Sequence, residues 1–115
     1  MRRGDIYLAD LDPVRGSEAN KVRPVILVTN DAANRMAERA GRGVLTVVPL
    51  TSNVTHVWPF QVLLDADECG LRQASKAQCE QIRAADVSRI GKHIGSVPPQ
   101  AMRAIDTALR RQLAI

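Results

Sequence analysis

The stretch Pro24-Val25-Ile26-Leu27-Val28-Thr29 decides the fold that the sequence predicts. Four of its six residues are β-branched and none is charged, as expected for a strand buried on both faces at the centre of a sheet. The residue before a proline is restricted to extended backbone geometry, so Arg23 should stand at the start of this strand. We therefore expect a central strand that begins at the Arg23-Pro24 pair.

Further apolar stretches on both sides of this strand predict a small, mostly β structure. Pro49 cannot donate to a sheet ladder, which indicates an edge or a bulge in the strand that contains it. Asn30-Asp31 supplies an N-cap for a short helix over residues 32–40. Residues 65–70 are expected to form an acidic turn and residues 85–90 one helical turn. Strands are expected over the ranges that share the apolar pattern: 4–11, 44–50, 60–64 and, less regularly, 75–82.

The C-terminal segment has the pattern of an amphipathic helix. Pro98-Pro99 fits its first turn. Apolar residues then recur at spacings of three and four, at Met102, Ile105, Leu109 and Leu113. Such a stripe must be buried against a sheet or a second subunit. Together these elements predict one domain over residues 1–115, mainly β with attached helices and built as a small antiparallel barrel.

The charge balance favours a polyanionic partner. The chain carries 16 Lys and Arg residues against 12 Asp and Glu residues, which favours nucleic acid. No apolar run approaches the about 18 residues that cross a bilayer. The charged start is followed by no signal-peptide core, so we expect a cytoplasmic protein with no membrane contact. Cys69 and Cys79 match neither a redox motif nor a zinc-ligand pair, and we expect both to be packed as free thiols.

Two polar motifs stand at the ends of predicted strands. Arg23 adjoins a polar loop over residues 12–22, and its forked guanidinium matches the oxygens of a phosphodiester. Thr51-Ser52-Asn53 directly follows a strand and offers hydroxyl and amide groups to phosphate or base edges. Each motif also fits an ordinary structural role, as a surface ion pair or as turn chemistry.

A third polar motif, Glu80-Gln81-Ile82-Arg83, is expected near the end of the 75–82 strand. Alternation would place Glu80 and Ile82 on one face and Gln81 and Arg83 on the other. The amide of Gln81 can both donate and accept, which suits recognition of a base. An ordinary solvent-exposed face explains the same pattern.

Taken in order along the chain, these motifs resemble the MazF/PemK family of toxin endoribonucleases from type II toxin–antitoxin systems. The resemblance covers essentially the whole chain. Lys76 and Gln78 depart from it, because many relatives have a more apolar strand there. The motifs that carry the resemblance are Arg3-Gly4-Asp5-Ile6-Tyr7 with Ala9-Asp10-Leu11-Asp12-Pro13, the loop Val14-Arg15-Gly16-Ser17-Glu18, Arg23-Pro24-Val25-Ile26-Leu27-Val28, Val48-Pro49-Leu50-Thr51-Ser52 and Glu80-Gln81-Ile82-Arg83.

The resemblance implies a fold, an activity and partners. The fold is an SH3-like (CcdB/PemK-type) barrel that forms homodimers. The activity is cleavage of single-stranded RNA at short preferred sequences, which inhibits translation and growth, without metal or other cofactor. The partners are the RNA and a cognate MazE-like antitoxin that blocks the RNA groove. By motif, the catalytic pair is Arg23 and Thr51, and the RNA-contacting residues are Arg15, Ser17, Glu18, Ser52, Glu80 and Gln81.

The mechanism that follows is attack of the RNA 2′-hydroxyl on its own phosphate, which leaves a 2′,3′-cyclic phosphate and a 5′-hydroxyl end. Arg23 would stabilise the developing charge and Thr51 would hold a phosphate oxygen. Glu18 is the candidate general base. Arg23 can instead protonate the leaving oxygen.

Other functions fit single features of the chain. His56 and His93 would suit a two-histidine nuclease. The two histidines together with Cys69 and Cys79 would provide the four ligands of a zinc site, but their spacing along the chain is not that of usual zinc sites. A pure RNA-binding module would need aromatic platforms, and the chain has few aromatic residues. Trp58-Pro59-Phe60 could contact a base or an antitoxin, or pack in the core or a dimer.

A CcdB-like toxin that binds DNA gyrase is the alternative on the same fold. That family depends on a terminal Trp-Gly-Ile. This chain ends in Leu113-Ala114-Ile115, and its only tryptophan is Trp58. The sequence therefore favours the ribonuclease.

Overall fold

The computed structural model describes residues 1–13, 15–19 and 21–115. Val14 and Asn20, which belong to the long loop expected after the first strand, lie outside the described residues. The elements are β1 (Asp5–Asp10), β2 (Val22–Leu27), α1 (Asp31–Ala40), β3 (Val44–Thr51), β4 (Gln61–Leu64), α2 (Ala66–Cys69), β5 (Ser75–Gln78), the 3₁₀ turn η1 (Cys79–Gln81), β6 (Arg83–Asp86), the 3₁₀ turn η2 (Val87–Arg89), β7 (Ile90–Ser96) and α3 (Pro99–Leu113).

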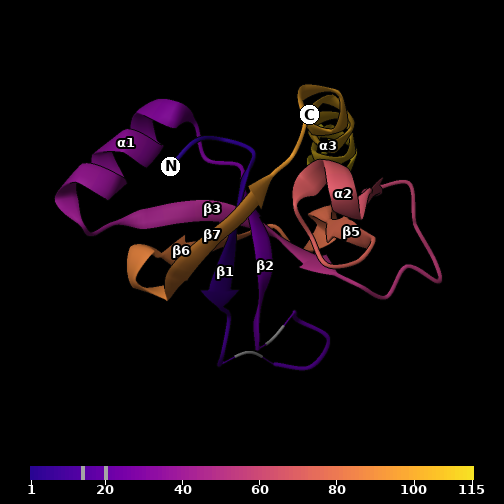
Figure 1. Cartoon of the computed structure of the whole chain (residues 1–115), viewed down its shortest axis with the longest axis horizontal. Helices are drawn as coiled ribbons and strands as arrows, with labels where there is room; N and C mark the ends of the chain where they lie inside the picture. The colour runs from indigo at the N-terminus through magenta and orange to yellow at the C-terminus, as the bar shows by residue number, and fades with distance from the viewer. Residues whose placement is uncertain (14, 20) are drawn as a thin grey trace.

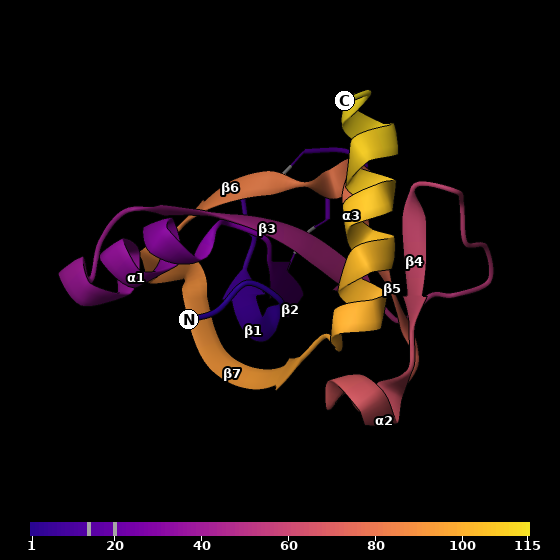
Figure 2. The same ribbon diagram turned by 90° about the horizontal axis from the view of Figure 1, so that it is seen from above.

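Seven antiparallel strands form one bent sheet in the order β4-β5-β3-β2-β1-β7, with β6 also paired to β3. The long strand β3 pairs with β6 near its start and with β5 at its end. The helices α1 and α3 lie at opposite ends of β3 in both views (Figures 1 and 2). The expected mainly β, antiparallel fold with a C-terminal helix is confirmed, and the sheet is barrel-like, with β4 and β7 as its ends.

The central strand β2 is buried on both faces, as its sequence predicts. Val25 and Leu27 belong to one hydrophobic cluster, beside α1, while Ile26 belongs to a second cluster, beneath α3. All three side chains are at most 1% exposed. This double burial explains why an unbroken apolar run, and not an alternating pattern, marks the centre of the sheet.

The two long helices begin as expected. Asn30 is the N-cap of α1 and its side chain accepts the backbone N–H of Ala33 at 2.9 Å. In α3, Ile105 and Leu109 are buried, but Leu113 is 49% exposed. The first part of the stripe is thus buried against β4 and η1, the elements that α3 contacts, and burial of Leu113 by a second subunit stays a prediction.

The strands differ from the sequence prediction in one element, and one strand was missed. Residues 75–82 are not one strand: β5 ends at Gln78 and η1 follows, so Glu80 and Gln81 do not alternate across a sheet. The strand β7 was not predicted at all. Pro49 lies inside β3, opposite Val25 of β2, and it is unpaired on its other side, which agrees with the edge or bulge that the proline predicts. On the other side of β3, β6 pairs only up to Val47 and β5 starts at Leu50, so the proline falls between two partner strands.

Two predicted turns were also partly wrong. The acidic segment 65–70 contains the short helix α2, because Asp65 caps it at the N-terminus and Gly70 adopts a left-handed conformation with φ of 76° at its C-terminus. The helical turn expected over residues 85–90 is confined to η2, since residues 85 and 86 belong to β6. Among the described residues, no helix is long and apolar enough to cross a membrane.

Candidate functional site

Arg23 and Thr51 line the same groove, which has a volume of about 710 Å³. The register of the two central strands explains their proximity. Val25 lies opposite Pro49 in the β2–β3 ladder, and continuing that register by two residues brings Arg23 opposite Thr51. Directly opposed residues of an antiparallel pair point to the same face of the sheet. The guanidinium also reaches β3, since its Nη1 donates to the Leu50 carbonyl at 3.5 Å.

Positive charge and apolar surface together define the groove. Arg72 and Lys92 join Arg23 among the lining residues, and both are exposed. The remaining walls come from five segments of the chain: Leu8 of β1, Val22 and Pro24 of β2, Leu50 and Ser52 at the end of β3, Gly70, Leu71, Gln73 and Ser75 around the α2–β5 connection, and Ile94 of β7. None of the described lining residues is Asp, Glu or His. The groove is therefore suited to an anionic ligand and holds no side chain that titrates near neutral pH.

Sequence reasoning missed Arg72 and Lys92. Lys92 lies on β7, a strand that the sequence did not predict, and Arg72 follows α2, where a simple turn was expected. Because β7 was not placed in the sheet and the connection after α2 was not placed beside β2, neither cation could be assigned to the Arg23 groove. A register for β7 against β1 would have found Lys92, but that ladder contains two irregularities.

The loop residues expected to contact a ligand lie outside the groove lining. Arg15 and Ser17 are exposed. The carboxylate of Glu18 accepts the backbone N–H of Arg15 at 2.7 Å, and the Glu18 N–H donates to the Arg15 carbonyl at 3.1 Å. These two bonds close a tight turn. The candidate base Glu18 is thus engaged within its own loop.

The residues of the third motif brace neighbouring segments. Gln81 donates from Nε2 to the carbonyl of Ser17 and accepts at Oε1 from the N–H of Ala19, both at 3.1 Å. Glu80 accepts at Oε2 from the side-chain amide of Gln61 at 2.8 Å. Of the six residues expected to contact RNA, only Ser52 lines the groove.

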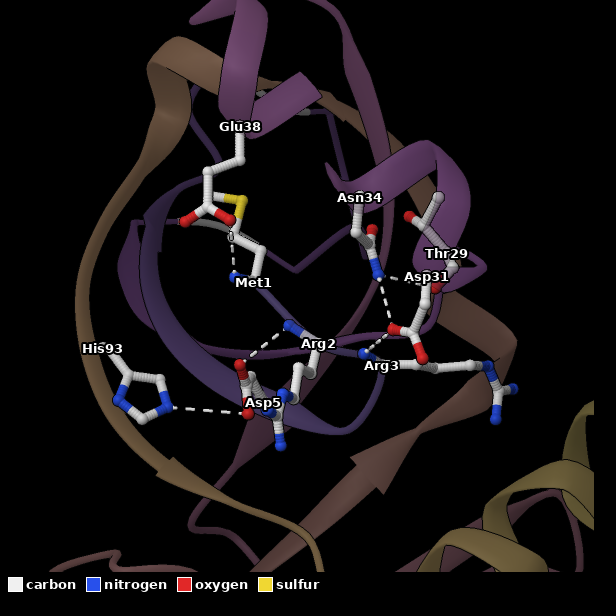
Figure 3. Close-up of polar contacts among 9 residues, drawn as sticks. All are labelled: Met1, Arg2, Arg3, Asp5, Thr29, Asp31, Asn34, Glu38 and His93. Atoms are coloured by element: carbon white, nitrogen blue, oxygen red, sulfur yellow. Dashed lines mark hydrogen bonds and ion pairs between the residues drawn. The ribbon is translucent and has the colours of Figure 1, made fainter. Parts of the chain in front are cut away.

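The two histidines lie on different elements. Lys92 and Ile94 line the groove, but His93 between them points to the opposite face of β7, where its Nε2 lies 3.7 Å from Asp5 Oδ1 (Figure 3). His56 belongs to the β3–β4 loop and is also absent from the groove lining. The structure therefore gives no support to a two-histidine site.

The cysteines are free and buried. Burial, assisted by the nearby Glu80 carboxylate, raises the pKa of the Cys79 thiol to about 12, and burial also raises the pKa of Cys69. Both therefore stay protonated at neutral pH, which opposes a role as thiolate ligands. Across the described part of the chain, His, Cys, Asp and Glu side chains form no group of three that could hold a metal ion.

Comparisons with known proteins agree with this architecture. The family model described as "PemK-like, MazF-like toxin of type II toxin-antitoxin system" matches residues 2–113. Endoribonuclease MazF9 of Mycobacterium tuberculosis is 53% identical over 113 residues, which cover 98% of this chain and 96% of that protein. Endoribonuclease EndoA of Bacillus subtilis is 36% identical over 116 residues, covering 100% of this chain and 96% of the relative.

Solved structures show the same fold at lower sequence identity. The crystal structure of MazF (Form-I) from Deinococcus radiodurans has a TM-score of 0.83 at 21% identity and covers 100% of this chain and 97% of that one. An endoribonuclease in complex with its cognate antitoxin, from a mycobacterial species, has a TM-score of 0.79 at 23% identity and covers 100% and 96% of the two chains.

Proposed function

Because the chain belongs to the PemK-like, MazF-like toxins of type II toxin–antitoxin systems, we propose that it is a toxin endoribonuclease that cleaves single-stranded RNA. Two relatives that match over nearly their whole length carry the name endoribonuclease. The observation that carries the proposal for this chain is the shared groove of Arg23 and Thr51. Metal or another cofactor is not needed for the mechanism that follows.

The proposed reaction is an internal transesterification. The 2′-oxygen of the RNA forms a bond to the adjacent phosphorus as the bond from phosphorus to the 5′-oxygen breaks. The 2′-hydroxyl loses a proton and the leaving 5′-oxygen gains one. Arg23 presents its donors where negative charge develops on the phosphate. Thr51, opposite it in the strand register, holds a non-bridging oxygen and keeps the attack in line.

The two proton transfers differ in whether the groove already holds a group for them. Glu18 can accept the 2′-hydroxyl proton only if the turn closed by its bond to Arg15 opens and carries the carboxylate to the groove. Arg23 already lies in the groove and can protonate the leaving 5′-oxygen. We therefore assign Arg23 the second transfer and keep Glu18 as the candidate for the first.

The remaining contacts and partners follow the same proposal. Ser52 would bind RNA directly, while Arg15 and Ser17 would do so from the adjoining loop, which Gln81 braces. A cognate MazE-like antitoxin would cover this groove, and a second copy of the chain would complete a homodimer. We place the protein in the cytoplasm, where free thiols such as Cys69 and Cys79 remain reduced.

The test is incubation of the purified chain with a defined long RNA in excess chelator, followed by mapping of both new ends. We expect discrete cuts with 5′-hydroxyl and 2′,3′-cyclic phosphate ends. Cuts that leave 5′-phosphates, or cleavage that appears only when Mg²⁺ is restored, would contradict the mechanism. Inhibition of purified DNA gyrase without RNA cleavage would support the gyrase-binding alternative.

A further inference from the structure

The loop over residues 52–60, between β3 and β4, carries three aromatic rings in near-parallel order. The rings of His56 and Trp58 lie 5.0 Å apart between centroids and 8° from parallel. Those of Trp58 and Phe60 lie 6.4 Å apart, also 8° from parallel. Trp58, the middle ring, is 50% exposed. Trp58 is therefore not packed in the core of this chain, which leaves contact with a base, an antitoxin or a second copy as the other roles that the sequence allows.

Hydrogen bonds from neighbouring strands hold the loop in this shape. Lys76 of β5 is only 9% exposed, and its Nζ donates to the carbonyl of His56 at 2.5 Å. Gln61 bonds both backbone groups of Trp58, since its side chain accepts from the N–H at 3.1 Å and its own N–H donates to the carbonyl at 2.8 Å. Glu80 fixes the Gln61 amide in turn. These contacts fix the backbone of the loop at His56 and Trp58.

The loop starts at the groove. Thr51 and Ser52 line the groove, and the N–H of Asn53 donates to the Thr51 hydroxyl at 3.3 Å. The ring stack therefore belongs to the same continuous segment as the proposed catalytic threonine. A strand of RNA that leaves the groove along this segment would meet flat aromatic surface.

We propose that the stack of His56, Trp58 and Phe60 is a platform on which a nucleobase of the single-stranded RNA, next to the cleaved phosphodiester, stacks. This inference rests on the proposed endoribonuclease function and adds a specificity element to it. Every base offers a flat π-face, and stacking on an aromatic side chain strengthens binding by about 5- to 150-fold per base. Because the platform is held before binding, little conformational entropy is lost when a base stacks.

An RNA base fits this surface better than a second protein. The rings are parallel and flat, their backbone is held by hydrogen bonds, and the adjoining groove carries Arg23, Arg72 and Lys92. Cationic grooves joined to aromatic platforms are the common design of single-strand binding sites. The positive charge of the adjoining groove favours a polyanionic strand over a protein as the occupant of this surface.

Trp58 is the only tryptophan of the chain, so its fluorescence reports the platform directly. The probe is a 2′-O-methyl oligoribonucleotide, which has no free 2′-hydroxyl to attack. The matched control is an abasic strand of the same length and charge. We expect Trp58 emission to fall with the base-containing strand, in step with binding measured by anisotropy, and to stay constant with the abasic strand. An equal response to both strands, or binding without any response, would overturn the platform.

Substitutions separate stacking from charge. Trp58→Leu should weaken binding of the same strand by about 5- to 150-fold without changing the salt dependence, because no phosphate contact is lost. Trp58→Phe should recover most of the affinity. Val57→Ala, at the exposed neighbouring position, should leave affinity unchanged. Unchanged affinity in Trp58→Leu would overturn the proposal, and so would a change in oligomeric state, because that outcome would assign the ring to an interface between two copies.

The failure of this inference is distinguishable from failure of the proposed function. If the native chain cleaves RNA and Trp58→Leu retains both kcat/KM and the cleavage-site preference, the function stands and the platform is wrong. If strand binding changes Trp58 emission but no RNA is cleaved, base stacking on the rings stands, whereas the nuclease proposal and the place of that base beside a cleaved bond are wrong.

Discussion

Two polar regions of this protein use charge in opposite ways. One is the groove around Arg23. The other, called here the N-terminal cluster, lies beside α1 and consists of the residues drawn in Figure 3: Met1, Arg2, Arg3, Asp5, Thr29, Asp31, Asn34, Glu38 and His93. In the cluster, charged groups are paired within the chain. The N-terminal amine bonds Glu38 at 2.9 Å, and the Asp31 carboxylate accepts the N–H of Arg3 at 2.7 Å. In the groove, three cations come together without a carboxylate among the described lining residues. The first arrangement stabilises the folded chain, whereas the second places positive charge around a groove that an anionic ligand can enter.

The N-terminal cluster contains the side chains that usually suggest acid–base catalysis. His93 lies near Asp5, and its ring packs on Tyr7 with 5.0 Å between centroids. Burial raises the pKa of Tyr7, and the nearby Asp5 and Glu38 carboxylates raise it further. These contacts link β1, β7 and α1, and none of the groups lines the groove. In this chain, residues suited to proton transfer support the fold, and the proposed site relies on positive charge and alignment.

The largest effect should come from Arg23. Removing one preorganised donor lowers a cleavage rate by about 10²–10³-fold, so Arg23→Ala should lose at least that much activity in excess chelator. Arg23→Lys should also be severely impaired, because a point charge does not replace the guanidinium fork. Circular dichroism and thermal melting should show both variants folded. Near-normal turnover by Arg23→Ala would show that the groove is not the catalytic site, and the two regions would then not differ in function.

Asn34 should show the opposite behaviour, with a large effect on stability and none on chemistry. Its side chain is fully buried and donates to the Thr29 carbonyl at 2.8 Å. Asn34→Ala should lower the free energy of unfolding by about 1–3 kcal/mol, because it leaves that carbonyl without its donor. Urea denaturation measures the loss. The cleavage rate per folded molecule should be unchanged. A lower rate would show that the N-terminal cluster affects catalysis in the groove.

The central strand beside the groove could be predicted from the sequence, and the reason is physical. The run after Arg23 is apolar without interruption because β2 is buried on both faces. The meeting of Arg23 and Thr51 was expected only from family resemblance. Spacing alone does not give it, since it depends on the register Val25–Pro49 between strands separated by a helix.

The failures also have local causes. Ala77 and Cys79 are both fully buried, so the alternating pattern of β5 continues into η1 although the backbone has left the sheet. The strand β7 contains two glycines and a Lys-His pair, a pattern that does not distinguish a strand from a loop. Because β7 was not predicted, Lys92 could not be assigned to the groove, and the positive charge of the groove was not recognised.

Lys92 tests whether the groove binds phosphate beyond the catalytic pair. If its ammonium neutralises one phosphate, Lys92→Met should reduce the slope of log affinity against log salt by about 0.7 for single-stranded RNA. Filter binding of a non-cleavable strand at several salt concentrations gives the slope. The matched control is Arg111→Met, an exposed cation on α3 outside the groove lining. Equal slopes for the two variants would show that Lys92 neutralises no phosphate.

Asp31 gives the cluster a small pH dependence. The hydrogen bond from the Arg3 backbone, followed by the Asn34 amide and nearby arginines, lowers the pKa of this exposed carboxyl from 3.8. A lowered pKa in the folded state stabilises the protein above the unfolded pKa, and that stability is lost as pH falls through the folded value. Asp31→Asn should therefore melt below the native chain at neutral pH. The gap in Tm should narrow below about pH 4, and a gap that stays constant down to pH 2 would show that charge has no part in it.

The smallest effect should be that of His93. Its ring is half-exposed, 3.7 Å from Asp5, and on the face of β7 opposite the groove lining. His93→Gln should therefore leave the cleavage rate and the cleavage-site preference unchanged, and it should alter the free energy of unfolding by no more than about 0.5 kcal/mol, as for most surface substitutions. Lys92→Met, one residue away and facing the groove, is the matched contrast. If His93→Gln abolished cleavage while Lys92→Met did not, the acid–base residues of the N-terminal cluster would be the reacting groups and the assignment of the two regions would be reversed.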